Sequence, residues 1–200
     1  MEFFRRARGE PRRLGILPGT FNPVTVAHLA MARAALAEVD EVVLVLPRVL
    51  PHKEYSGATF SERLEILRAA AAGWPQFSVA VTNGGLFVEI ANECREQYGP
   101  APRLWFLCGR DAAERIAGWN YGSPDAFAGM LRQFGLLVAA RAGEYTAPEG
   151  YEDAIRRLDL AGNYEHVSGT ETRARIRRGE AWEHLVPEAA RNSVRAVYAP

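Results

Sequence analysis

Two short segments, far apart in the chain, combine residue types that can hold phosphate. The first is Gly19-Thr20-Phe21-Asn22-Pro23, followed by Thr25 and His28, between an apolar run and a helix-like pattern. Thr25 and His28 are three residues apart, so on a helix both side chains project from one face. Open N–H groups at a helix start attract phosphate oxygens, and an imidazole can stabilise negative charge that grows during phosphoryl or nucleotidyl transfer. This segment therefore predicts a phosphate site.

The second segment is Ser168-Gly169-Thr170-Glu171-Thr172-Arg173. Ser168 with Glu171 three residues later matches a capping box, which predicts the start of a helix. Thr170 and Arg173 would then stand one turn apart and face the same way, beside the open N–H groups. A hydroxyl, a guanidinium and a helix N-terminus together favour a polyphosphate ligand.

The elements that must position these segments follow from the apolar pattern. The predicted strands are Leu14–Leu17, Glu41–Leu46, Phe77–Val81, Arg103–Leu107 and Gly135–Ala139, and the predicted helices are Val26–Ala37, Ser61–Ala72, Leu86–Tyr98 and Asp111–Ile116. Continuous apolar strands that alternate with helices predict an α/β fold, a Rossmann-like doubly wound parallel sheet with helices on both faces. Ligands of such sheets bind at the carboxyl ends of the strands, where Gly19–His28 would lie.

The two ends of the chain depart from this central pattern. Residues 1–13 contain five arginines and no apolar segment of a secretory signal, so we expect a flexible arginine-rich arm before a single domain over residues 14–200. We expect Gly118–Gly129 to be a loop, Tyr164–Val167 a short strand, and the C-terminal part to be helical.

Composition limits the partners and the compartment. Lys plus Arg and Asp plus Glu number 24 each, and this balance argues against nucleic acid or a membrane as partner. No apolar run approaches the roughly 20 residues that cross a bilayer. Cys94 and Cys108 fit free thiols in a reducing compartment. We therefore expect a cytoplasmic protein with small-molecule partners; a homo-oligomer is possible, but the sequence does not define one.

Both phosphate-type segments resemble motifs of a known family. Gly-Thr-Phe-Asn-Pro followed by Thr-x-x-His is similar to the first signature of the nucleotidyltransferases, and Ser168-x-Thr170-x-x-Arg173 resembles their second motif. The likeness is strongest to the nicotinate and nicotinamide mononucleotide adenylyltransferases, the ATP-using enzymes of NAD synthesis. It runs from about Leu14 to the C-terminus.

This resemblance implies roles for individual residues. The catalytic residues would be His28, Thr25 and Arg173, which stabilise the reacting phosphates. ATP would contact Gly19, Thr20, Phe21, Asn22, His28, Gly109, Asp111, Ser168, Thr170 and Arg173. The acceptor would contact His52 and Lys53 of a Pro-His-Lys loop and the ring of Trp119. Mg²⁺ would be held mainly by the ATP phosphates rather than by protein ligands.

The implied reaction transfers AMP from ATP to nicotinate or nicotinamide mononucleotide and releases pyrophosphate. Leu86-Phe87-Val88, however, stands where bacterial nicotinate enzymes carry a Ser-Tyr-Thr-like run that helps to bind the pyridine carboxylate, and Gly169 replaces a second Ser. Two alternatives therefore stay open. One is a nucleotidyltransferase that uses ATP or CTP with another acceptor, such as phosphopantetheine or a sugar or glycerol phosphate. The other is a nucleotide-binding regulator that has lost transfer.

Overall fold

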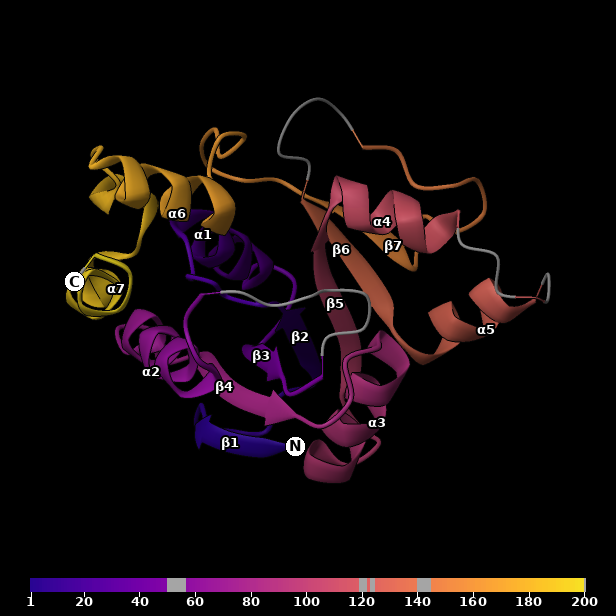
Figure 1. Cartoon of the computed structure of the whole chain (residues 1–200). Coiled ribbons are helices and arrows are strands. Elements are labelled where there is room, and N and C mark those ends of the chain that lie inside the picture. Colours follow the sequence, from indigo (N-terminus) through magenta and orange to yellow (C-terminus); the bar gives the residue numbers. More distant parts are fainter. Residues whose placement is uncertain (50–56, 119–121, 123–124, 140–144, 200) are drawn as a thin grey trace.

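A seven-stranded sheet forms the centre of the computed structural model, which describes residues 1–49, 57–118, 122, 125–139 and 145–199 (Figure 1). Its strand order is β1-β4-β3-β2-β5-β6-β7. The strands are β1 (Glu2–Arg5), β2 (Arg13–Pro18), β3 (Glu41–Pro47), β4 (Phe77–Thr82), β5 (Arg103–Gly109), β6 (Gly135–Ala139) and β7 (Ile155–Leu158). All neighbouring strands run parallel except β1, which pairs antiparallel with β4.

Helices cover both faces of this sheet. They are α1 (Val26–Ala35), α2 (Phe60–Ala71), α3 (Phe87–Tyr98), α4 (Arg110–Ala117), α5 (Ala126–Gln133), α6 (Gly169–Arg178) and α7 (Arg191–Tyr198), with short 3₁₀ turns at Glu183–Leu185 and Glu188–Ala190. One core cluster packs α1, α2 and α7 on one face, and a second packs α3, α4 and α5 on the other. The doubly wound α/β fold predicted from the sequence is therefore confirmed.

Burial explains why the central strands read as continuous apolar runs. Every residue of β3 and of β4 is buried, because helices exclude water from both sides of the sheet. The helix that follows β3 starts at a reciprocal cap: the N–H of Glu62 donates to the hydroxyl of Thr59 (3.3 Å), and the N–H of Thr59 donates to the Glu62 carboxylate (2.7 Å).

The order of the strands reverses at β2, which pairs with β3 on one side and with β5 on the other. A reversal of this kind opens a crevice at the carboxyl ends of the strands, which is where doubly wound proteins bind their ligands. The loops that follow β2, β3, β4 and β5 all begin at this edge. The phosphate-type segment after β2 thus lies at the expected place in the fold.

The N-terminal arm differs from the prediction. Its residues Glu2–Arg5 form the edge strand β1 instead of a flexible tail. The guanidinium of Arg5 donates to the carbonyls of Phe77 and Trp74 (3.1 Å each), and the N–H of Ala7 donates to Ser78 Oγ (2.8 Å). Backbone pairing and these bonds together hold the arm against β4.

Three further elements correct the sequence analysis. The helix α5 occupies part of the predicted loop Gly118–Gly129. The segment Tyr164–Val167 forms a turn, in which the N–H of Val167 donates to the carbonyl of Tyr164, rather than a strand. The last strand is instead β7, in which the first and last residues, Ile155 and Leu158, are buried and the two arginines between them are exposed.

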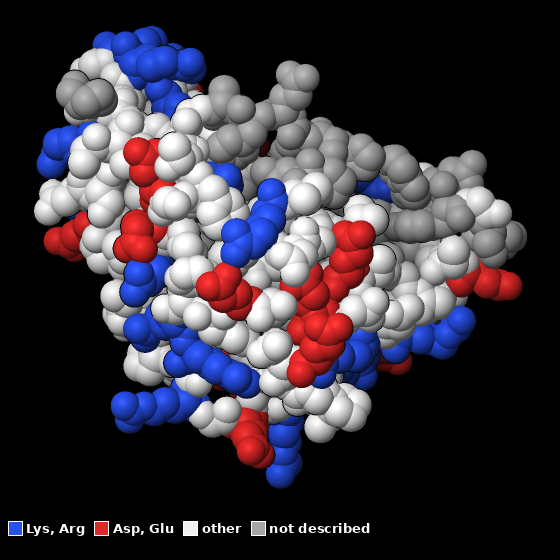
Figure 2. Space-filling view, turned by 60° about the horizontal axis from the view of Figure 1, so that its bottom comes forward, with Lys and Arg blue, Asp and Glu red and all other residues white. Residues whose placement is uncertain are grey.

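Surface charge and helix length complete the description of the fold. Figure 2 shows basic and acidic side chains interspersed on the face it displays, rather than one continuous area of a single sign. Among the described residues, no helix has the length and apolarity needed to cross a bilayer.

Candidate active site

The loop between β2 and α1 has a defined shape. The N–H of Gly19 donates to the carbonyl of Val45 in β3 (3.0 Å), which ties the start of the loop to the sheet. Phe21 has a φ of 44°, in the left-handed region that a bulky residue rarely adopts. Its ring is buried directly beneath Gly19, where a Cβ would lie 3.1 Å from the ring carbons. A glycine before a strained phenylalanine therefore sets this conformation.

Thr25 fixes the orientation of His28. The N–H of Thr25 donates to His28 Nδ1 (3.1 Å), and the Thr25 hydroxyl lies 2.8 Å from the same nitrogen. A backbone N–H is always a donor, so Nδ1 accepts and the neutral ring carries its proton on Nε2. The edge of the ring also packs against Phe21, with 5.2 Å between ring centroids. The side chain of Thr25 is fully buried, and its hydroxyl contacts the imidazole.

The two phosphate-type segments meet in the structure. Arg173, on α6, donates through Nη1 to the carbonyl oxygen of Asn22. A Cβ on Gly169 would lie 2.6 Å from the same oxygen, so a residue without a side chain is needed for this approach. Figure 1 likewise shows α6 beside α1. Residues that are 151 positions apart in the chain are thus in direct contact.

The start of α6 shows a simple N-cap rather than the full capping box. Ser168 Oγ accepts from the N–H of Glu171 (3.0 Å). The Glu171 carboxylate, however, pairs with Arg175 (2.7 Å) instead of returning to the cap. Thr170 is exposed, and its hydroxyl has no partner among the described residues. A hydroxyl and a helix N-terminus therefore face solvent beside the loop.

The residues expected to contact adenosine follow β5, on the other side of the point where the strand order reverses. Gly109 ends β5 and caps α4, and Asp111 stands exposed in the first turn of that helix. Because β5 pairs directly with β2, both residues belong to the same edge as Gly19. Asp111 also borders a cavity of about 730 Å³ that Glu114, Arg115 and Gly118 line. The acceptor residues predicted from the sequence, His52, Lys53 and Trp119, lie outside the described residues.

Two residues that the sequence analysis did not single out also contact the loop. Arg63 of α2 is only 4% exposed and donates through Nη1 to the carbonyl of Thr20 (2.8 Å). The hydroxyl of Tyr198, in α7, donates to Asn22 Oδ1. A sequence signal existed for Arg63, because it shares a helical stripe with the buried Ile66, Leu67 and Ala70. A cation at such a position indicates a specific partner.

Thiol chemistry and a protein metal cluster are not features of the described site. Burial raises the pKa of Cys108, at the end of β5, to about 12, so this group stays a neutral thiol near pH 7. Burial likewise raises the pKa of Cys94 to about 12. In the described part of the chain, no three His, Cys, Asp or Glu residues gather as a metal site.

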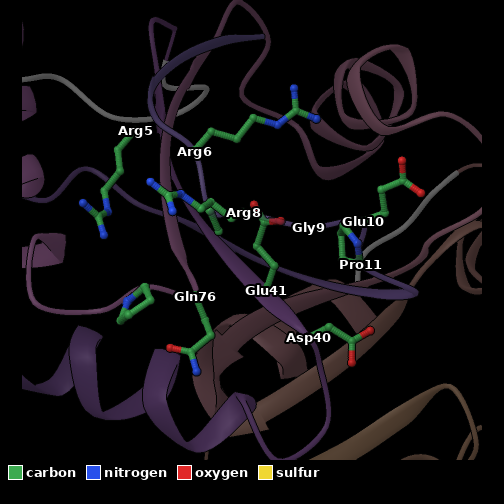
Figure 3. Close-up of a pocket in the computed structure, with 11 residues that line it drawn as sticks. Arg5, Arg6, Arg8, Gly9, Glu10, Pro11, Asp40, Glu41 and Gln76 are labelled. Carbon is green, nitrogen blue, oxygen red and sulfur yellow. The ribbon is translucent and has the colours of Figure 1, made fainter.

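A second cavity, of about 670 Å³, lies near the amino ends of β3 and β4 (Figure 3). Residues of the N-terminal arm line it together with Glu41, whose carboxylate accepts from the hydroxyls of Ser78 and Tyr98. No residue predicted for the phosphate site borders this cavity. It belongs to the packing of the arm on the sheet.

The two phosphate-type segments meet where the strand order of the doubly wound sheet reverses. This arrangement is typical of α/β proteins that bind nucleotides. A family model described as cytidylyltransferase-like matches residues 16–175. This match covers most of the chain, including both segments, so the chain belongs to the cytidylyltransferase-like family and is a nucleotidyltransferase.

Curated relatives narrow the likeness further. A probable nicotinate-nucleotide adenylyltransferase of Gloeobacter violaceus is 31% identical over 88% of this chain and 90% of that protein. A protein of the same name in Citrifermentans bemidjiense is 29% identical over 92% of this chain and 95% of its own. The Plasmodium falciparum nicotinic acid mononucleotide adenylyltransferase complexed with NaAD has the same fold, with a TM-score of 0.68, 13% identity, and coverage of 92% of this chain and 94% of that chain.

Proposed function

We propose that this chain transfers AMP from ATP to the 5′-phosphate of nicotinate or nicotinamide mononucleotide and releases pyrophosphate. The observation that carries the proposal is the contact between Arg173 and the loop at Asn22. This contact joins the segment that carries His28 to the segment that carries Thr170 and Arg173, and it supports the proposal because a triphosphate substrate would need both. The curated relatives, which match nearly the whole chain, bear a name for this activity.

The reaction needs positioning and charge stabilisation rather than a protein nucleophile. An oxygen of the acceptor phosphate forms a bond to the α-phosphorus of ATP, and the bond from that phosphorus to the pyrophosphate oxygen breaks. His28 donates from Nε2 to a non-bridging α-phosphate oxygen as negative charge grows. Thr25 holds the ring, while Thr170, Arg173 and the start of α6 stabilise pyrophosphate. Mg²⁺ would be held mainly by the ATP phosphates, and when bound it would neutralise part of their charge.

The start of α3 bears on the choice between the two acceptors. By resemblance, this is where nicotinate enzymes bind the pyridine carboxylate. Here the N–H groups of Gly85 and Leu86 donate to the Glu89 carboxylate (3.0 and 2.9 Å). Those of Asn83 and Gly84 donate to Glu93 in the same way (2.9 Å each). Carboxylates of the protein therefore occupy these four backbone donors, which leaves them unavailable to a nicotinate carboxylate.

The side chains at the start of α3 agree with this reading. Leu86 and Val88 are 47% and 36% exposed and offer only apolar surface. Phe87 turns into the core and stacks on Phe106, with 4.3 Å between the ring centroids. The uncharged carboxamide of nicotinamide mononucleotide would meet no charge repulsion here, whereas the carboxylate of nicotinate mononucleotide would face Glu89. These contacts favour nicotinamide mononucleotide as the acceptor.

The test is a pyrophosphate-release assay with ATP or CTP and a panel of phosphorylated acceptors. We expect turnover with ATP and a pyridine mononucleotide, and faster turnover with the nicotinamide form. Turnover confined to phosphopantetheine, a sugar phosphate or glycerol phosphate would replace this function with the related transferase. Binding of ATP without turnover of any acceptor would favour a nucleotide-binding regulator.

A further inference from the structure

Side chains from three separate helices hold the loop that follows β2. Arg63 of α2 bonds the carbonyl of Thr20, Arg173 of α6 bonds the carbonyl of Asn22, and Tyr198 of α7 bonds the side chain of Asn22. These contacts join the loop to residues 43, 151 and 176 positions away in the chain. The conformation of the loop therefore depends on the packing of α2, α6 and α7.

The carbonyl contacts have an electrostatic consequence. Carbonyl oxygens carry partial negative charge, and exposed ones would repel the phosphates of a nucleotide. Guanidinium groups cover the carbonyls of Thr20 and Asn22, so both oxygens meet positive charge instead. In a trans peptide the C=O and N–H point in opposite directions. The bond from Arg63 to Thr20 thus also turns the N–H of Phe21 away from α2.

The burial of Arg63 indicates that this contact is specific. Its side chain is 4% exposed, and the guanidinium lies 5.5 Å from the centroid of the Phe60 ring. Removing a cation from water is costly, so a buried guanidinium needs strong partners. Lysine would supply a point charge in place of the planar fork and would not reproduce this arrangement.

We propose that Arg63 and Tyr198 are positioning residues that preorganise the loop following β2 without touching substrate. They hold the backbone at Thr20 and the side chain of Asn22 in the shape that receives ATP. The part of this inference that concerns ATP rests on the proposed function, because KM and kcat can be measured only on an active enzyme. The shape of the loop itself can be measured without any ligand.

The experiment compares Arg63→Lys and Tyr198→Phe with the wild-type protein. The matched control is Arg68→Lys, on the same helix, where the guanidinium is 44% exposed and pairs with Glu65. Amide hydrogen exchange at residues 19–22 is measured without ligand, followed by KM for ATP, kcat and the melting temperature. We expect faster amide exchange in the loop of both variants. We also expect KM for ATP to rise about tenfold in both, which corresponds to the loss of about one hydrogen bond. Arg68→Lys should match the wild type.

Each outcome decides the inference. Loop exchange and ATP affinity within about twofold of wild type in both variants would overturn it. If Arg63→Lys fails to fold, Tyr198→Phe, which deletes only a hydroxyl, decides alone. A lowered melting temperature with unchanged KM and unchanged exchange at residues 19–22 would show a merely structural role and also overturn it. If the wild type neither binds ATP nor releases pyrophosphate, the proposed function fails, while faster loop exchange still supports the positioning role.

Discussion

At the residue scale, the orientation of His28 depends on Thr25. Both the N–H and the hydroxyl of Thr25 lie within hydrogen-bond distance of Nδ1, which leaves Nε2 as the proton-bearing nitrogen. Replacing His28 with Ala removes the proposed donor to the α-phosphate, and we expect kcat to fall about 10²–10³-fold. Thr25→Val keeps the volume and the backbone bond but loses the hydroxyl, so kcat should fall about tenfold.

The measurement for both variants is the initial rate of pyrophosphate release at saturating ATP. Melting temperatures close to the wild-type value would show that the fold is kept. A Thr25→Val protein with full kcat would mean that the backbone N–H alone orients the ring. A His28→Ala protein with near-normal turnover would remove the catalytic role of the imidazole.

At Gly169, the absence of a Cβ atom allows the two phosphate-type segments to come into contact. A Cβ there would lie 2.6 Å from the carbonyl oxygen of Asn22, in the contact between the two phosphate-type segments. We expect Gly169→Ser to push these segments apart, to cost about 1–3 kcal/mol of stability and to weaken ATP binding. The control is Gly73→Ser, where a Cβ meets nothing within 4 Å. Chemical unfolding and ATP titration of both variants check this, and equal behaviour would contradict it.

At the element scale, long apolar strands could be predicted from sequence and short edge strands could not. The runs in β3 and β4 are buried on both faces, so their composition alone identifies them. By contrast, β1 contains two charged residues and β7 two exposed arginines. Edge strands of this kind depend on pairing with a neighbour, which a local pattern does not reveal.

The residues of the candidate site show the same contrast between local sequence signals and contacts that form only in the folded chain. Local motifs predicted the helix starts of α1 and α6, because a loop followed by a helix start is encoded in consecutive residues. Arg63 and Tyr198 lie on other helices, and only the folded chain brings them to Thr20 and Asn22. Positioning residues are thus the part of this site that the sequence conceals.

The start of α3 provides an element-scale prediction about the acceptor. Glu89 accepts from the N–H groups of Gly85 and Leu86 and places a carboxylate at the helix N-terminus. In Glu89→Ala these donors become available, so we expect the ratio of kcat/KM for nicotinate over nicotinamide mononucleotide to rise about tenfold. Glu96→Ala, an exposed position on the same helix, is the control. An unchanged ratio would show that the acceptor ring does not meet the start of α3.

At the scale of the whole molecule, the N-terminal arm closes one edge of the sheet. Without β1, the buried strand β4 would expose unpaired backbone groups along an apolar strand. Deleting residues 1–9 also removes the bonds from Arg5 to Trp74 and Phe77. We therefore expect the melting temperature to fall by about 5–10 °C and aggregation to increase.

The control for the deletion is Arg8→Ala. Arg8 is exposed and has no partner among the described residues, so its loss should leave the melting temperature unchanged. Thermal unfolding and light scattering measure both proteins. A deleted chain with wild-type thermal stability would mean that pairing between β1 and β4 adds nothing to the folded state.

Asp40 joins the arm to the body of the molecule in a pH-dependent way. Its carboxylate accepts from the backbone N–H of Arg13 (2.8 Å) and of Arg12 (2.9 Å), and these bonds, with the Arg13 guanidinium, lower the pKa of Asp40. A carboxyl group with a lowered folded-state pKa contributes stability above its unfolded pKa, near 3.9, and loses it as the pH falls through the folded pKa. We expect the free energy of unfolding to decline below about pH 4, and to decline less steeply in Asp40→Asn.

Urea titrations between pH 7 and pH 3 measure how steeply the free energy of unfolding changes with pH. The control is Asp153→Asn, because Asp153 is an exposed carboxyl without a partner among the described residues. Parallel slopes for the wild type and Asp40→Asn would show that the protonation of Asp40 is not coupled to folding.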